Sequence, residues 1–111
     1  LMQNGAANIL HLYLSKCGGL YPALQITKLA KAFDVDVTLG ERVPLGICEA
    51  ADAHFAAALP QLNYPCAIAY DLNEHDLLVR SLERSQGTLR VPEGPGLGIE
   101  VDEEKVAFYA V

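Results

Sequence analysis

The chain has 111 residues, 51% of them hydrophobic, and a formal net charge of −6 at pH 7. This length suits one domain with its own core. The negative charge argues against a nucleic-acid partner, because such binding needs a positively charged surface. The sequence has no run of 18 apolar residues and no basic segment followed by an apolar block. It therefore predicts neither a membrane-spanning helix nor a secretory signal.

The three cysteines, Cys17, Cys48 and Cys66, are odd in number and widely spaced. They form no CxxC pair and none of the ligand spacings that are typical of zinc sites. We interpret them as reduced thiols of a cytoplasmic protein, and we predict no metal site made from them.

The first predicted unit is a strand followed by a helix. Residues 8–15, NILHLYLS, place three leucines on one face and the polar side chains on the other, as in a strand packed under helices. The glycine pair at 18–19 ends this strand. Apolar residues then recur at helical spacing and predict a helix over 20–33.

Two further units are predicted after the first. Residues 35–40 are the second strand, and the alanine-rich segment 47–59 is the helix that follows it. The third strand is predicted over 66–72, and a helix with its cap at Asn73 is predicted over 74–85. The remainder has too many prolines and glycines for a helix or a central strand until about Asp102, after which a short acidic-capped segment ends the chain.

The alternation of strands and helices predicts an α/β fold in which parallel strands are joined by right-handed crossovers. We expect residues 1–87 to form three βα units and residues 88–111 to form a Pro/Gly-rich tail that packs on them. Three parallel strands leave two open edges and an apolar face. The predicted sheet is therefore incomplete by itself.

Three stretches carry a resemblance to a known family: residues 16–40 (KCGGLYPALQITKLAKAFDVDVTLG), 44–60 (PLGICEAADAHFAAALP) and 91–106 (VPEGPGLGIEVDEEKV). They resemble the C-terminal part of the mandelate racemase and muconate cycloisomerase group of the enolase superfamily. The resemblance implies a partial (β/α) TIM-type barrel, in which this chain supplies barrel strands six to eight and the C-terminal tail.

The same resemblance implies an activity for the complete enzyme. Members of the family remove a proton next to the carboxylate of a small substrate, and racemisation, cycloisomerisation or elimination follows. A magnesium ion stabilises the intermediate and is held by three carboxylates on barrel strands three to five. This sequence contains none of those strands, and it therefore supplies no ligands for the implied magnesium.

Candidate site residues follow from the ends of the predicted strands. In the family, a second acid/base stands five residues before the glycine pair, where this chain has Tyr13, and Lys16 stands two residues before it. We predict both as catalytic residues, because a tyrosine acts as a base at neutral pH beside a cation or a metal. Glu41 and Arg42 after the second strand, and Asp71 at the end of the third, are predicted to bind substrate. Tyr13 and Arg42 depart from the residues usual at these positions.

Two other functions remain open from the sequence. The chain is also compatible with a non-catalytic βα fragment that self-associates, which predicts a homo-oligomer or a complex with the missing barrel half. A small-ligand binding module without chemistry is the third possibility.

Overall fold

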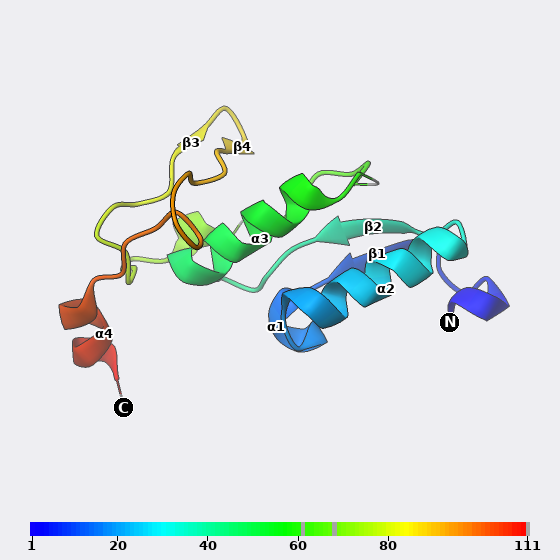
Figure 1. The fold of residues 1–111 in the computed structure, drawn as a ribbon, viewed down its shortest axis with the longest axis horizontal. Coiled ribbons are helices and arrows are strands. Elements are labelled where there is room, and N and C mark those ends of the chain that lie inside the picture. The colour runs from blue at the N-terminus through cyan, green and yellow to red at the C-terminus, as the bar shows by residue number, and fades with distance from the viewer. Residues whose placement is uncertain (61, 68, 111) are drawn as a thin grey trace.

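The computed structural model describes residues 1–60, 62–67 and 69–110. Its elements follow one another along an elongated molecule, with the two termini at opposite ends (Figure 1). In chain order they are η1 (Met2–Asn4), β1 (Ile9–Leu12), α1 (Leu14–Cys17), α2 (Leu20–Ala32), β2 (Asp36–Leu39), α3 (Gly46–Ala58), η2 (Tyr70–Leu72), β3 (Arg84–Ser85), β4 (Thr88–Leu89) and α4 (Glu103–Tyr109).

The core lies around the parallel pair β1 and β2. Their register joins Ile9 to Asp36 and Leu12 to Leu39, and α2 makes the crossover between the two strands. Leu12, Val37 and Leu39 are buried. Burying an aliphatic side chain of this size contributes roughly 1.5–3 kcal/mol, so these residues account for much of the cohesion of the unit. The predicted alternation, the first crossover helix and the second strand are confirmed.

The first strand is shorter than predicted. It ends at Leu12, and the chain turns into α1, in which Cys17 N–H donates to the Tyr13 carbonyl (N···O 2.9 Å). Gly18 and Gly19 follow with φ values of 88° and 104°, a region that glycine enters without steric cost. Lys16 therefore lies on a helical turn beyond the strand rather than on the strand itself.

The predicted third strand is reduced to a single parallel bridge in the part of the chain that the structure describes. This bridge joins Gly40 to Ala67, and Ala67 N–H donates to the Leu39 carbonyl (2.8 Å). Position 68 of the predicted strand lies outside the described residues. The end of the predicted strand is the 3-10 helix η2.

The prediction of a helix over 74–85 is wrong. Leu78 is buried, and Val79 N–H donates to the Glu100 carbonyl (3.0 Å), so this segment runs extended beside the C-terminal part of the chain. The predicted capping box is not formed. Asn73 instead donates its amide to the Pro44 carbonyl (2.6 Å), and Asp76 accepts from Gly46 N–H (2.8 Å). These contacts to the start of α3 outweigh the local preference for a helix.

The β3–β4 hairpin joins the segment before residue 87 to the segment after it. The chain ends in α4, whose N-cap Asp102 accepts a hydrogen bond from Lys105 N–H (3.1 Å). This is the predicted acidic-capped segment, formed as a helix of about two turns. None of the helices in the described ranges combines the length and the apolar character needed to cross a membrane.

Candidate functional site

The ends of β1 and β2 meet at one edge of the sheet, as parallel strands require. Ser15 donates its backbone N–H to Glu41 Oε1 (3.0 Å) and its hydroxyl to Glu41 Oε2 (2.9 Å). This pair fixes the turn after β1 against the turn after β2. Glu41 is thereby held at the carboxyl ends of the strands, the position at which barrel enzymes carry their functional groups.

Tyr13 and Lys16 lie together on the turn after β1. The Lys16 ammonium lies 4.0 Å from the centroid of the Tyr13 ring, a cation–π contact. The ring of His11 meets Tyr13 edge to face, with 5.2 Å between the centroids. Tyr13 is half-buried and Lys16 exposed, so a cation and a phenol stand side by side where both can be reached from solvent.

The other two predicted residues lie apart from this pair. Asp71 forms an ion pair with Arg84, whose guanidinium also lies 5.1 Å from the Tyr70 ring centroid. Arg42 is exposed, and among the described residues nothing forms a hydrogen bond or an ion pair with it. Tyr13 and Lys16 thus lie in contact, and Glu41 lies at the same edge of the sheet. Asp71 is instead paired with Arg84 of the hairpin strand β3.

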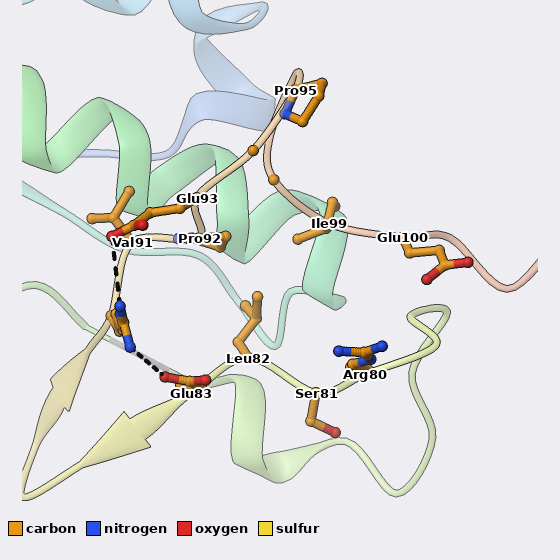
Figure 2. Close-up of a pocket in the computed structure, with 13 residues that line it drawn as sticks. Arg80, Ser81, Leu82, Glu83, Val91, Pro92, Glu93, Pro95, Ile99 and Glu100 are labelled. Atoms are coloured by element: carbon orange, nitrogen blue, oxygen red, sulfur yellow. Dashed lines mark hydrogen bonds and ion pairs between the residues drawn. The ribbon is translucent and has the colours of Figure 1, made fainter.

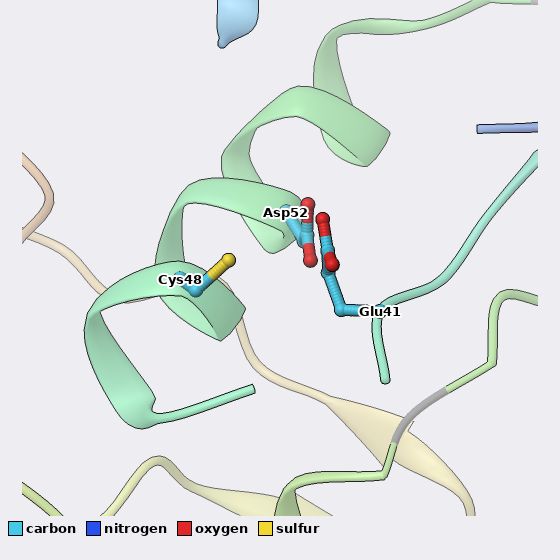
Figure 3. Close-up of side chains that lie close together, drawn as sticks. All are labelled: Glu41, Cys48 and Asp52. Atoms are coloured by element: carbon cyan, nitrogen blue, oxygen red, sulfur yellow. The ribbon is translucent and has the colours of Figure 1, made fainter. Parts of the chain in front are cut away.

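A further cluster, not predicted from the sequence, lies beside Glu41. One ligand-type atom from each of Glu41, Cys48 and Asp52 lies within 4.8 Å of the other two (Figure 3). Cys48 and Asp52 share one face of α3 because they are four residues apart in a helix. That spacing was a signal in the sequence, but the third member comes from the turn after β2 and shows only in the folded chain.

Burial and mutual repulsion shape the ionisation of this cluster. Burial, reinforced by the charges of Glu41 and Glu49, raises the pKa of Asp52 to about 7. Burial and the nearby carboxylates, first Asp52, raise the pKa of the Cys48 thiol to about 11. The pKa of Glu49 is also raised by burial, against the opposing effect of Arg84. Each of these pKa values is raised because the group is partly buried and has further acidic groups close by.

The donors of this cluster do not fit the magnesium ion that the family implies. Magnesium takes oxygen ligands in near-octahedral geometry, whereas one of the three donors here is a thiol. Among the described residues, no other group of three or more histidine, cysteine or acidic side chains lies close enough to share an ion. We therefore derive no catalytic step through magnesium from this chain.

Besides a cleft of about 920 Å³ that is lined by Asp71 and Arg84, two clefts lie near these elements. One, of about 550 Å³, lies between the segment 80–83 and the Pro/Gly-rich segment 90–100 (Figure 2). Arg90 on its wall is paired with Glu83 and Glu93. The other, of about 360 Å³, lies between the end of β2, α3 and β4 and is largely apolar, with Glu49 and Asp52 among its walls. Neither cleft is lined by Tyr13 or Lys16.

Comparison with known proteins identifies the family. Residues 1–105 match the model described as "Enolase C-terminal domain-like". The chain is 35% identical over 91 residues to a probable glucarate dehydratase of Streptomyces coelicolor, a match that covers 82% of this chain and 21% of that protein. It is 31% identical over 108 residues to muconate cycloisomerase 1 of Rhodococcus opacus, a match that covers 96% of this chain and 29% of that protein.

Solved structures of enolase-superfamily enzymes also resemble this chain. The muconate lactonizing enzyme from Klebsiella pneumoniae superposes with a TM-score of 0.91 at 27% identity, over 99% of this chain and 31% of that one. An enolase from Gibberella zeae crystallised with magnesium, formate and sulfate gives a TM-score of 0.88 at 27% identity, over 96% of this chain and 26% of that one. This chain belongs to the enolase C-terminal domain-like family of the enolase superfamily. It spans between about a fifth and a third of the length of these proteins.

Proposed function

We propose that the chain is the C-terminal part of a magnesium-dependent, cytoplasmic enzyme that removes a proton next to the carboxylate of a small substrate. The observation that carries this proposal is the match of residues 1–105 to the family model, together with the small share of each relative that the chain spans. The chain would then contribute the last three βα units of a (β/α) barrel, strands six to eight, and the tail. Its relatives by name include a dehydratase and a cycloisomerase, so lyase and isomerase chemistry are both within its class.

In this proposal Tyr13 and Lys16 act on the proton. Their cation–π contact holds the Lys16 ammonium against the Tyr13 ring, so that the two groups can act together at the end of β1. Lys16 is exposed and can also reach a substrate carboxylate directly.

Glu41, Arg42 and Asp71 are proposed to bind substrate in the complete enzyme. Glu41 is fixed by Ser15 at the carboxyl ends of the strands. The exposed guanidinium of Arg42, next along the chain, is suited to bidentate contact with a carboxylate. Asp71 would have to exchange Arg84 for substrate, so we expect it to matter least of the three.

The magnesium ion is proposed to bind outside this chain. The donors found here do not suit it, and one of the similar solved structures contains magnesium. When bound in the complete enzyme, the ion would stabilise the negative charge that develops on the substrate carboxylate. The residues of this chain would then position the substrate and move its proton.

The test uses the full product of the gene that encodes this chain, purified with magnesium. Substrates to assay are acid sugars such as glucarate, and muconate and its chlorinated forms. The substitutions Tyr13→Phe and Lys16→Met are each expected to lower kcat by about 10²-fold or more, which is the usual contribution of acid–base catalysis. Tyr21→Phe and Lys28→Met, on the exposed side of α2, are matched controls and should leave kcat unchanged. No turnover and no binding of any of these acids, or full activity of Tyr13→Phe and Lys16→Met, would contradict the proposal.

A second candidate is a self-associating βα unit without chemistry. It is favoured by large apolar side chains that remain exposed beside the two-stranded sheet, among them Ile9 (43% exposed) and Tyr21 (72%). Light scattering on the isolated chain distinguishes the two functions. An oligomer of fixed size that persists on dilution supports this candidate, and a monodisperse monomer removes it.

A further inference from the structure

We propose that Ser15 and Glu41 together recognise a hydroxyl group, so that the substrate of the complete enzyme is a hydroxylated acid of the acid-sugar class. Ser15 is the positioning residue, and Glu41 is the acceptor that meets the substrate. The inference rests on the proposed function and deepens it, because it names the substrate group that Glu41 binds.

The hydrogen bonds of Glu41 decide what it can bind. Ser15 donates its backbone N–H to Glu41 Oε1 (3.0 Å) and its hydroxyl to Glu41 Oε2 (2.9 Å), so both carboxylate oxygens act as acceptors. An ionised carboxylate has about four acceptor sites on its two oxygens. Ser15 fills one site on each oxygen. The remaining sites accept from a hydroxyl of the substrate but not from its carboxylate, which has no proton to donate.

Ser15 also fixes the direction of these open sites. Its two donors belong to one residue and hold the two oxygens of one carboxylate, which sets the plane of that carboxylate. Ser15 lies on the same turn as Tyr13 and Lys16, and Glu41 is half-buried, which leaves part of its side chain open. An acceptor that is held in advance loses little freedom when substrate binds, and it therefore discriminates better than a mobile one.

The charge at this point favours a neutral group. An oxygen of the Asp52 carboxylate lies within 4.8 Å of an oxygen of Glu41. Repulsion between like charges disfavours a substrate carboxylate here, whereas a hydroxyl carries no charge. The carboxylates of the substrate are then left to Lys16 and to the exposed guanidinium of Arg42.

Glucarate and muconate separate the two alternatives, because both are dicarboxylates of the same chain length and only glucarate carries hydroxyls. A site built to hydrogen-bond a hydroxyl discriminates strongly against the analogue that lacks one, since its polar group is then left unpaired. With the full product of the gene and magnesium, we expect kcat/KM for the best acid sugar to exceed that for muconate by about 10³-fold or more.

Variants of the same full protein assign the effect to the pair. Ser15→Ala removes the hydroxyl bond and should raise KM for the preferred acid sugar by about tenfold at nearly unchanged kcat, since it weakens ground-state and transition-state binding alike. Ser15→Thr keeps a hydroxyl and should restore the KM. In a Glu41→Ala background, which has already lost the acceptor, Ser15→Ala should have no further effect. A merely structural role of Ser15 would instead lower the active fraction, and with it the apparent kcat, at unchanged KM.

Ser85→Ala, at an exposed serine of β3, is the control and should leave both constants unchanged. Circular dichroism checks that each variant is folded, and if Ser15→Ala is not, the nearly isosteric Glu41→Gln has to raise the same KM. The inference alone is overturned if the full protein turns over muconate at least as well as any acid sugar, or if folded Ser15→Ala and Glu41→Gln keep the KM of the unaltered protein. An unaltered protein that neither turns over nor binds any of these acids contradicts the proposed function, and this inference with it.

Discussion

Gly40 lies where β2 ends and the turn that carries Glu41 begins. A Cβ built at this position would stand 2.8 Å from the Cβ of Ala67 and 2.8 Å from the ring of His11. Only a residue without a side chain lets the segment at 67 bridge to the end of β2. The glycine is therefore required by close packing and not by its backbone dihedral angles.

Gly40→Ala is accordingly expected to lower the free energy of unfolding by about 1–3 kcal/mol, the usual cost of overpacking. Urea denaturation measures this change. A double variant, Gly40→Ala with Ala67→Gly, removes one of the two clashes and should recover part of the loss. An unchanged denaturation midpoint for Gly40→Ala would show that the two segments do not approach this closely.

Part of the arrangement around Tyr13 can be predicted from the sequence, and part of it depends on the fold. The leucine alternation predicts that Tyr13 lies on the face opposite the leucines, and the glycine pair predicts the turn beside it. The contact of Lys16 with Tyr13, by contrast, depends on the early end of β1 at Leu12. Sequence reasoning misses the cluster of Glu41 with Cys48 and Asp52, because its members meet only when α3 packs against the end of β2.

At the scale of elements, the hairpin between β3 and β4 depends on its two-residue turn. Gln86 and Gly87 have φ values of 48° and 77°, positive at both central positions as a type I′ turn requires. Asparagine tolerates this region better than glutamine does, and Asn-Gly is the preferred pair. Gln86→Asn should therefore stabilise the hairpin.

The expected gain from Gln86→Asn is roughly 0.5 kcal/mol, within the range of a relieved backbone conformation. Amide exchange of Arg90, whose N–H donates to the Glu83 carbonyl at the base of the hairpin (2.9 Å), reports it locally. Slower exchange is predicted for Gln86→Asn and faster exchange for Gln86→Val, which is β-branched. Equal rates in all three chains would mean that the turn does not limit the hairpin.

The stability of helix α4 is expected to depend on pH, because its N-cap is a carboxylate. The hydrogen bond from Lys105 N–H lowers the pKa of its N-cap, Asp102, below the ordinary value. Because the pKa is lowered in the folded chain, the stabilisation is complete above the ordinary carboxyl pKa and is lost as the pH falls through the lower, folded value. We expect α4 to fray below about pH 4.

Amide exchange of Val106, whose N–H donates to the Asp102 carbonyl (3.0 Å), follows this fraying. Asp102→Asn keeps a capping oxygen that does not titrate, so its protection, corrected for intrinsic exchange, should change little with pH. Asp102→Ala should lack the cap at every pH. A pH dependence in Asp102→Asn as large as in the unaltered chain would assign the effect to another group.

The elements divide into those that the local pattern determines and those that distant contacts determine. The strands β1 and β2 and the helices α2 and α3 follow the periods of their apolar residues, and the sequence predicts all four. Residues 74–85 also carry a helical pattern but run extended. Leu78 packs against Gly46, and the backbone pairs with the segment around Glu100, contacts that no local pattern reveals.

At the scale of the whole molecule, the two-stranded sheet leaves apolar surface uncovered. Exposed apolar side chains gather on the unit around β1 and α2, including Ile9, Leu20 and Leu29. Such a surface is typical of a unit made to pack against further structure. The proposed missing barrel strands would cover it.

The uncovered apolar surface predicts that the upstream part of the proposed barrel binds and stabilises this chain when the two are produced together as separate polypeptides. Co-purification and a higher unfolding midpoint are the expected results, since binding of the folded form adds to its stability. A charged substitution on the exposed face, Ile9→Lys, should weaken the complex by roughly tenfold or more, in line with an apolar contact residue. Gln86→Lys, at the exposed tip of the β3–β4 hairpin and outside the unit around β1 and α2, is the control. Failure of the two parts to associate would count against the barrel.

The most direct test of the central claim is the intact mass of the natural product of the gene that encodes this chain. The chain alone has a mass of 12.0 kDa and spans 29% of the Rhodococcus opacus cycloisomerase that it resembles. We predict a product of roughly 40 kDa, the size of a (β/α) barrel with a further domain. A natural product of 12.0 kDa would contradict the claim that this chain is the C-terminal part of a larger enzyme.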